Sequence, residues 1–368
     1  MSADRPGLYI GHCGDLGRQR ELNEDSYLIL TPPAIAPGMD ALLAVADGMG
    51  GHRAGDVASR TLVEMLDGLF TSSAYQQHVA YSSQHTDYYV VVLKEVLEQA
   101  NERLYSLSAG RPELSGMGTT VTVALLAGGR LFWGHVGDSR AYLLRNGGLQ
   151  RLTHDHTWVA EQVGTGQMTP EEAARHPRRN VLTQLLGNSL LVRVERGVQQ
   201  VQTGDSLLLC SDGLSGVVSD AEMQETLLAE ADPQAACDRL VALANQRGGP
   251  DNITVLAARL TANGLGSNIV GGRVLGPVQH EAPAQPLADT LKLRRGWRRQ
   301  WVVSRRWLAR RFGVALVLSL GALLSGLGTL LVGLIPFPAG LPVVAFSAVV
   351  AFVLGALLGW LLRPARPK

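Results

Sequence analysis

The chain has 368 residues, and its 33 Lys and Arg residues against 32 Asp and Glu residues give a formal net charge of +1. The charge is unevenly distributed along the chain. Residues 291–368 contain twelve basic side chains and no acidic one, which leaves a net charge of −11 on the first 290 residues. An acidic front part argues against nucleic-acid binding, which needs a basic surface. The asymmetry indicates two parts that face different surroundings.

The sequence also excludes several other kinds of site. Cys13, Cys210 and Cys237 form no C-x-x-C pair, which argues against a disulfide framework or a thiolate zinc site and fits a reducing cytosol. None of the three lysines follows a G-x-x-x-x-G motif, so a P-loop is excluded. The first residues contain no long apolar run, and we expect no secretory signal peptide.

Residues 1–260 have the length of one large domain, in which short β-rich runs are mixed with helical stretches. Turns such as Gly128-Gly129 and Asn146-Gly147-Gly148 favour antiparallel pairing of the strands that they connect. Helices are predicted at 54–70, 88–107, 221–230 and 233–246. Strands are predicted at 27–30, 41–46, 119–126, 131–136, 141–144, 206–210 and 253–257.

Two polar segments follow the predicted domain. Residues 261–290 are rich in Gly, Pro, Ala and Asn without a sustained period, which is typical of a flexible linker. Residues 291–311 place Trp297, Trp301 and Trp307 among nine basic residues. This pattern indicates a juxtamembrane helix at an anionic inner leaflet, and the alternative is a plain stop-transfer flank.

Residues 312–362 contain no charged side chain and are interrupted near their middle by Pro336, Pro338 and Pro342. The arms on either side, 313–335 and 341–362, each exceed the ~20 residues that span a bilayer core as a helix. We therefore predict a two-helix transmembrane hairpin that ends in a basic tail, 363–368. Positive charge flanks both outer ends, which places the front domain and the C-terminus in the cytoplasm and makes the chain a multi-pass protein of the inner (cytoplasmic) membrane.

Carboxylates stand beside glycine or asparagine at the ends of predicted strands. One Asp-Gly pair can be an ordinary turn, but several carboxylates brought together would repel one another unless a cation neutralised them. Oxygen ligands without a convincing set of His or Cys select Mg²⁺ or Mn²⁺ rather than zinc. The residues at these strand ends are Asp47, Asp138, Asp212 and Asp251.

Six blocks of the sequence, in chain order between residues 8 and 260, resemble the metal-dependent serine/threonine protein phosphatases, often called the type 2C family. A lone Asp-Gly is a weak signal, whereas six ordered blocks are a strong one. The blocks are Arg20–Asp25 (RELNED), Asp47–His52 (DGMGGH), Gly118–Thr120 (GTT), Val136–Ala141 (VGDSRA), Ser211–Leu214 (SDGL) and Asp251–Val255 (DNITV).

The resemblance implies an α+β fold, a four-layer α-β-β-α sandwich of two antiparallel sheets flanked by helices, with two Mn²⁺ or Mg²⁺ ions in a cleft at one end. Asp47 would bridge both ions, and Asp212 and Asp251 would hold the first. Asp138 with Asp212 would form a weaker third site. The second ion would be served, largely through waters, by Glu24 or Asp25 and by the Gly48 carbonyl.

The resemblance also implies an activity, which is the hydrolysis of phosphoserine and phosphothreonine in proteins. Two divalent ions lower the pKa of a water that can attack phosphorus directly. Arg20 matches the arginine that binds the substrate phosphate, and its planar fork suits two phosphate oxygens. The implied partners are phosphorylated proteins, including a cognate serine/threonine kinase at the membrane, and the lipid bilayer.

Other residues of this region are less clearly assigned. His52 is either a general acid for the leaving oxygen or a structural histidine, because Met49-Gly50-Gly51 separates it from the Asp-Gly pair. We expect His154 and His156 to be loop residues. The segment 157–188 resembles the mobile flap that bacterial members place beside the cleft.

Three alternatives compete with this interpretation. A thiol phosphatase would need C-x₅-R, but positions 19, 216 and 243 hold Gln, Gly and Leu. An inactive, membrane-bound phosphoprotein-binding scaffold would be expected to lack metal ligands, and this sequence retains them. A phosphatase of a stress-regulator pathway would share the fold and metals, but it usually carries sensor domains ahead of the phosphatase.

Overall fold

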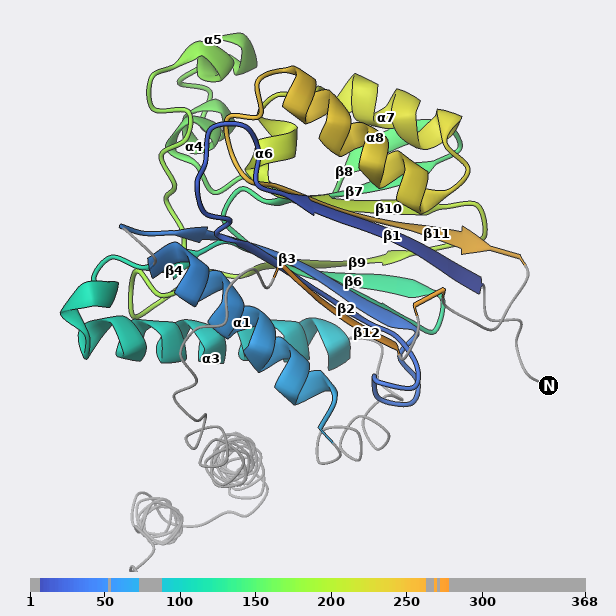
Figure 1. Cartoon of the computed structure of the whole chain (residues 1–368), viewed down its shortest axis with the longest axis horizontal. Coiled ribbons are helices and arrows are strands. Elements are labelled where there is room, and N and C mark those ends of the chain that lie inside the picture. Colours follow the sequence, from blue (N-terminus) through green and yellow to red (C-terminus); the bar gives the residue numbers. More distant parts are fainter. Residues whose placement is uncertain (1–6, 52–53, 73–87, 263–267, 270–271, 278–368) are drawn as a thin grey trace, which may run out of the picture. The chain divides into compact units, whose positions relative to one another are not determined.

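The computed structural model describes residues 7–51, 54–72, 88–262, 268–269 and 272–277. The chain divides into two units, Met1–His280 and Glu281–Lys368, and the described residues belong to the first. Two antiparallel sheets form the centre of this unit, and helices cover their outer faces (Figure 1). The predicted fold class is confirmed for this unit, whereas the predicted transmembrane hairpin lies outside the described residues.

The first sheet has five strands in the order β1-β11-β10-β7-β8. Its central strand β10 is buried along its whole length, which explains why the sequence there reads as a continuous apolar run. The strands are β1 (Gly7–Asp15), β7 (Arg140–Arg145), β8 (Gly148–Arg151), β10 (Ser206–Cys210) and β11 (Ile253–Thr261).

The second sheet has seven strands in the order β12-β2-β3-β5-β6-β9, with β4 paired to the end of β3. Strand β12 corrects one prediction, because it lies in the range 261–290 that reads as a linker and instead pairs with β2 at the edge of the sheet. The strands are β2 (Asp25–Leu30), β3 (Ala41–Met49), β4 (Gly118–Thr119), β5 (Val121–Ala127), β6 (Arg130–Val136), β9 (Glu195–Gln200) and β12 (Arg273–Gly276).

Four long helices cover the sheets. Helices α1 (Ala54–Phe70) and α3 (Tyr88–Ala109) pack on the seven-stranded sheet, while α7 (Asp220–Ala229) and α8 (Pro233–Gln246) lie over the five-stranded sheet (Figure 1). The predicted bounds of α1 and α8 are confirmed, and those of α3 and α7 are wrong by two residues or fewer. The short helices are η1 (Pro112–Leu114), α4 (Trp158–Gly164), α5 (Pro170–Arg175) and α6 (Asp212–Ser215).

Strand β10 shows how one apolar run serves two cores. Leu207 and Leu209 belong to the core between the two sheets, whereas Leu208 and Cys210 belong to the core beneath α7 and α8. Successive side chains of a strand point to opposite faces, so each core takes every second residue. The two cores fix β10 on both faces, and its last residue lies two positions before Asp212.

The predicted tight turns are confirmed. Gly128 and Gly129 connect β5 to β6 with φ values of 58° and 74°, and Asn146 and Gly147 connect β7 to β8 with φ values of 51° and 81°. Positive φ at both central positions is the geometry that joins antiparallel strands with the correct twist, and Gly and Asn tolerate it best.

Within the part of the chain that the structure describes, no helix combines the length and apolar character needed to cross a membrane. The predicted juxtamembrane segment 291–311, the arms 313–335 and 341–362, and the tail 363–368 lie outside the described residues.

Candidate metal centre

The predicted carboxylates come from strand ends that meet at one end of the sandwich. Asp25 begins β2 and stands opposite Asp47, near the end of β3. Asp212 follows β10 and begins α6, while Asp251 precedes β11, the antiparallel neighbour of β10. Antiparallel pairing brings the end of one strand beside the start of the next. Asp138 lies in the turn between β6 and β7, so five carboxylates converge.

Electrostatics confirm that these side chains lie close together. Burial raises the pKa of Asp47 well above its ordinary value, and the charges of Asp25, Asp212, Asp138 and Asp251 raise it further. Burial likewise raises the pKa of Asp25 to about 7 and that of Asp138 to about 8, with Asp212 as a repelling neighbour in both cases. Buried like charges favour the neutral form unless a cation is present. The cluster therefore resists ionisation in the absence of a cation.

Two carboxylate oxygens at this site have no hydrogen-bond partner. Asp212 Oδ1 and Glu24 Oε1 are both buried and unpaired. A buried polar atom without a partner costs about 1–3 kcal/mol, and this cost disappears if the atom binds a cation. The donor set consists of hard carboxylate oxygens, which suits Mg²⁺ or Mn²⁺. The residues present thus fit the divalent ions that the sequence predicts.

The structure distinguishes Glu24 from Asp25. Asp25 is 2% exposed and accepts a hydrogen bond of 2.7 Å from Ser211 Oγ, which itself accepts a 3.0 Å hydrogen bond from the Thr254 amide. Its carboxylate is therefore held by the chain itself, through Ser211, which directly follows β10 and is bonded to the backbone of β11. The carboxylate of Glu24 is only half buried, and one of its oxygens remains unpaired.

Helix α1 approaches the end of β3 through two glycines. A Cβ on Gly48 would lie 2.1 Å from the Gly55 carbonyl oxygen, and a Cβ on Gly55 would lie 2.5 Å from Glu24 Oε1. Real Cβ atoms do not approach other atoms so closely, so both positions require glycine. This contact sets the Glu24 carboxylate beside the backbone of Gly48, which is the predicted carbonyl ligand.

Arg20 reaches the carboxylates from the loop before β2. Its Nη2 donates a 2.6 Å hydrogen bond to Asp251 Oδ2, and its side chain is 46% exposed. Burial alone would lower the pKa of Arg20, but its hydrogen bond and attraction to Asp251, together with the charges of Glu24 and Asp47, raise it. The guanidinium of Arg20 is half exposed at the edge of the acidic cluster, so it can bind an anion that approaches from solvent.

The side chains that hold the site together are not among the predicted residues. Asn252 donates to the carbonyl oxygens of Leu16 and Leu22 and accepts a 2.8 Å hydrogen bond from the Glu24 amide. It thereby fixes the loop that carries Arg20 and Glu24. Asn252 belongs to one of the recognised blocks, but its role could not be read from the sequence, because its partners are backbone groups about 230 positions away.

Asp138 lies in the turn that connects β6 of the seven-stranded sheet to β7 of the five-stranded sheet. Its neighbour Arg140 is fixed by two hydrogen bonds to Asp155, of 2.9 and 2.7 Å. Burial would raise the pKa of Asp155, but these bonds and the charge of Arg140 lower it below its ordinary value. Arg140 also lowers the pKa of Asp138 against the stronger effect of burial. An ion pair thus supports the turn that presents Asp138.

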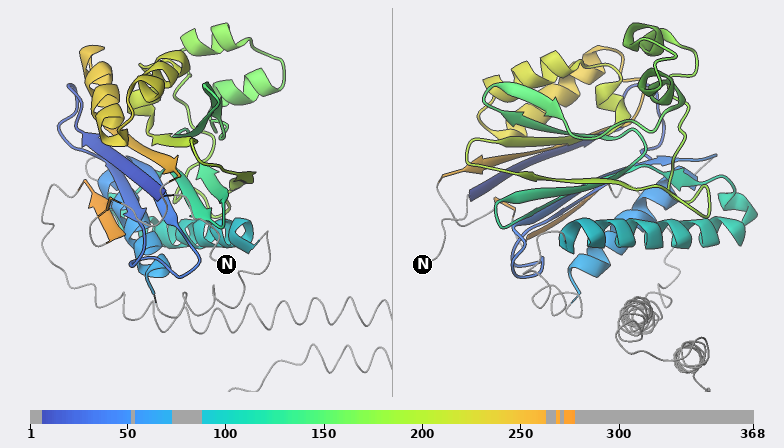
Figure 2. Two further views of the ribbon diagram at one scale, coloured as in Figure 1. Left: turned by 90° about the vertical axis from the view of Figure 1, so that its right-hand side faces the viewer. Right: turned by 180° about the vertical axis from the view of Figure 1, so that it is seen from behind.

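The predicted flap, 157–188, contains α4 and α5 and stands out from the sandwich (Figure 2). Its first and last parts pair with each other at Thr157 and Leu182, and Leu186 pairs with Thr119 in β4. Thr119 Oγ1 in turn donates to the carbonyl oxygen of Asp47. The flap is therefore anchored beside the carboxylates. His52 lies outside the described residues, so its role remains a prediction.

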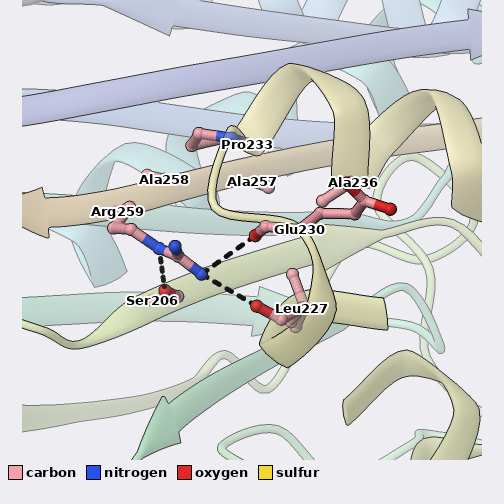
Figure 3. A pocket seen from close by; sticks show the side chains of 8 residues that line it. All are labelled: Ser206, Leu227, Glu230, Pro233, Ala236, Ala257, Ala258 and Arg259. Carbon is pink, nitrogen blue, oxygen red and sulfur yellow. Dashed lines mark hydrogen bonds between the residues drawn. The ribbon is translucent and has the colours of Figure 1, made fainter. Parts of the chain in front are cut away.

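A small cavity between α7, α8 and the five-stranded sheet is not this site. It is about 10 Å³ and lies where β10 begins and β11 ends, whereas the carboxylates lie where β10 ends and β11 begins. Arg259 extends into it and donates to Ser206 Oγ and to the carbonyl oxygens of Leu227 and Glu230 (Figure 3). A guanidinium that binds the last carbonyls of α7 stabilises the end of the helix.

Comparison with known proteins agrees with this geometry. The family model for protein phosphatase 2C matches residues 18–254. The serine/threonine phosphatase stp of Listeria monocytogenes serotype 4b is 40% identical over 242 residues, which cover 66% of this chain and 92% of the relative. The serine/threonine protein phosphatase PstP of Mycobacterium tuberculosis is 38% identical over 264 residues, which cover 71% of this chain and 47% of the relative.

Solved structures give the same result. The M. tuberculosis phosphatase PstP superposes with a TM-score of 0.59 at 38% identity, covering 69% of this chain and 99% of the solved chain. The PstP catalytic domain in complex with two manganese ions superposes with a TM-score of 0.57 at 36% identity, covering 69% and 98%. The family model alone spans more than half of the chain. The chain therefore belongs to the protein phosphatase 2C family, the metal-dependent serine/threonine protein phosphatases.

Proposed function

We propose that this phosphatase holds two Mn²⁺ or Mg²⁺ ions between the converging carboxylates and hydrolyses phosphoserine and phosphothreonine by direct attack of water. The observation that carries the proposal is the convergence of Asp47 with four other carboxylates, beside the unpaired oxygens of Asp212 and Glu24. When bound, the two cations would activate a water for attack on phosphorus and offset the charge that develops on the phosphate.

We assign the metal ligands by asking which oxygens already accept a hydrogen bond from the chain and which do not. Asp47 stands at the centre and would contact both ions, with Asp212 and Asp251 on the first. Glu24 and the Gly48 carbonyl would serve the second ion, because Glu24 Oε1 is unpaired. Asp25 would act as a support, since its carboxylate already accepts a hydrogen bond from Ser211 Oγ. Asp138, with Asp212, would hold the weaker third ion.

Arg20 would bind the phosphate of the substrate. Its guanidinium contacts Asp251 through Nη2, so part of the fork is available for phosphate oxygens. A bidentate contact orients the phosphate relative to the carboxylates and contributes charge-assisted hydrogen bonds. The exposed position of the side chain allows it to reach a phosphorylated residue on the surface of another protein.

The test is turnover of a phosphothreonine peptide and of p-nitrophenyl phosphate with and without divalent ions. We expect activity with Mn²⁺ or Mg²⁺ and none in EDTA, and Asp47→Asn should abolish activity while circular dichroism shows the fold retained. Asn keeps the size of the side chain but removes the charge. Equal turnover in EDTA would refute the two-ion mechanism.

We also propose that the chain is a multi-pass protein of the inner membrane that opposes a serine/threonine kinase there. The support is the uncharged stretch 312–362 with twelve basic residues around it and no acidic residue after position 290. A reporter fused after Arg366 should be cytoplasmic, and a periplasmic signal would refute the hairpin. Phosphoproteomics of a deletion strain should show phosphosites that accumulate, and their absence would contradict the role against a kinase.

A further inference from the structure

The flap and the turn that carries Asp138 meet at a buried cluster of polar side chains. Among the described residues, His135, His156 and Glu195 bring potential ligand atoms within 4.8 Å of one another. Both rings are buried, and their centroids are 4.9 Å apart. Such a group could hold a transition metal, so its hydrogen bonds decide between a metal site and a structural one.

The hydrogen bonds exclude the metal. The Gly137 amide donates a 3.1 Å hydrogen bond to His156 Nδ1, so that the neutral ring carries its proton on Nε2 and has no lone pair there for an ion. His135 Nε2 lies 3.1 Å from the carbonyl oxygen of His154, to which it donates. A ligating histidine normally donates its second ring N–H to an acceptor, and His156 does the opposite.

His156 instead holds the turn before Asp138. Besides the side-chain bond, its backbone amide donates a 2.7 Å hydrogen bond to the Gly137 carbonyl oxygen. Gly137 has a φ of +109°, and a Cβ there would lie 2.6 Å from the Thr120 side chain. The backbone N–H and C=O of Gly137 thus both bond to His156. Asp138 directly follows Gly137 in the chain.

The same histidine is part of the base of the flap. Its carbonyl oxygen accepts a 2.8 Å hydrogen bond from the Thr183 amide, where the returning chain of the flap passes. The next residue, Thr157, pairs with Leu182. His156 therefore contacts the outgoing chain, the returning chain and the Gly137 turn at once.

We propose that His156 is a positioning residue that couples the base of the flap to the Gly137 turn and so sets the position of Asp138 relative to Asp47 and Asp212. The inference rests on the proposed function, in which Asp138 is a ligand. A displacement of the flap base shifts His156, and the two hydrogen bonds pass that shift to Gly137. By reciprocity, an ion held by Asp138 stabilises one arrangement of the flap.

Three substitutions of His156 in the full chain separate the hydrogen bond from the bulk of the ring. His156→Asn places its Oδ1 near the position of Nδ1 and keeps the acceptor for the Gly137 amide. His156→Gln places its oxygen one bond further out, and His156→Leu has no acceptor. His154→Asn is the matched control, because that side chain is 82% exposed and contacts Glu195 rather than Gly137.

The first readout is trypsin cleavage after Arg178 and Arg179, which are exposed in the flap, measured with Mn²⁺ and with EDTA. We expect Mn²⁺ to slow cleavage at least about fivefold in the unmodified chain, the lower end of typical coupling between sites. His156→Asn and His154→Asn should keep this protection, while His156→Gln and His156→Leu should lose it. Calorimetric titration should show the weakest Mn²⁺ site bound roughly tenfold less tightly in the latter two.

Each outcome has a defined meaning. Protection of His156→Gln and His156→Leu equal to that of the unmodified chain would overturn the coupling, as would cleavage that Mn²⁺ does not affect in the unmodified chain. Loss of protection in all three His156 variants would overturn the assignment to the Nδ1 acceptor. Thermal unfolding shows whether each variant is folded. If His156→Leu does not fold, the comparison of His156→Asn with His156→Gln tests the proposal. Turnover of the unmodified chain in EDTA would refute the proposed function itself.

Discussion

At the scale of single residues, the site combines charges that repel one another with side chains that hold them in place. Five carboxylates meet at the strand ends, and desolvation together with neighbouring charges raises the pKa values of Asp25, Asp47, Asp138 and Asp212. Arg20 brings positive charge from the loop before β2, and Asn252 fixes that loop. The chain therefore stores an unfavourable charge arrangement that a divalent cation relieves.

Replacement of Arg20 tests the phosphate contact. We expect Arg20→Ala to raise KM for a phosphothreonine peptide about tenfold, because a hydrogen bond to a charged group contributes ~1.5–3 kcal/mol. Arg20→Lys should recover only part of this, since a lysine lacks the planar fork. Arg18→Ala is the control, as Arg18 is exposed on the same loop. Steady-state kinetics measures the effect, and an unchanged KM in Arg20→Ala would contradict the assignment.

A second prediction at this scale concerns His135. Burial and the neighbouring charge of His156 lower its pKa to about 4, against opposing effects of Glu195 and Asp155. The unfolded chain binds a proton near pH 6.5 but the native chain does not, so the contribution of neutral His135 to stability is present above pH 6.5 and is lost as the pH falls toward 4. The loss reaches about 3 kcal/mol at most.

The measurement is the urea midpoint of the unmodified chain and of His135→Asn between pH 7.5 and 4.5. The difference between the two proteins isolates His135, because the buried carboxylates titrate in both. We expect the unmodified chain to lose more stability on acidification than His135→Asn. Parallel pH profiles would show that His135 does not contribute.

At the scale of elements, the contact between α1 and β3 depends on two glycines. Gly55→Ala should push Glu24 away from the site, because the new Cβ would lie 2.5 Å from Glu24 Oε1 and 2.7 Å from the Gly48 carbonyl oxygen. We expect turnover to fall at least about tenfold, a change equivalent to ~1.4 kcal/mol in the barrier. Gly68→Ala, on the same helix with nothing within 4 Å, should instead stabilise the chain by ~0.5–1 kcal/mol. Turnover and thermal unfolding are measured for both variants. Equal effects of Gly55→Ala and Gly68→Ala would refute the role of the close contact at Gly55.

The elements that could be predicted from the sequence are those with a strong local pattern. Helix α1 has an apolar stripe at helical spacing, and β10 is a short apolar run, so both were located well. Strand β9 was missed because it is an edge strand whose side chains are alternately half-buried and exposed, with polar residues such as Arg196 and Gln199. Helices α4 and α5 were missed because they are short, although Thr169, Pro170 and Glu172 form a capping pattern that marks the start of α5.

The site shows the same limit. The types of residue predicted a site of oxygen ligands, because glycine and carboxylate recur at strand ends. The choice between Glu24 and Asp25 could not be made, since adjacent residues point in different directions and only the structure shows that Ser211 occupies Asp25. The role of His156 could not be predicted either, because it depends on hydrogen bonds to Gly137, a residue 19 positions away.

At the scale of the whole molecule, the net charge of +1 combines two opposite contributions. The −11 of the first 290 residues includes the carboxylates of the metal centre, whose charge bound cations would offset. The +12 that follows lies on both sides of the uncharged stretch 312–362. The acidic first part would bind divalent metal ions, and the basic second part would bind anionic lipid headgroups.

This division predicts how the protein can be extracted from membranes. Washing with about 1 M NaCl reduces the Debye length to ~3 Å and releases a protein held by charge alone. A protein inserted through two spans of about 20 residues should stay in the membrane after salt and after alkaline carbonate. We therefore expect the full chain to resist both treatments, a chain truncated after Arg311 to be released by salt, and a chain truncated after His280 to stay in the supernatant. Release of the full chain by salt would show that residues 312–362 do not insert and that basic residues alone hold the phosphatase at the membrane.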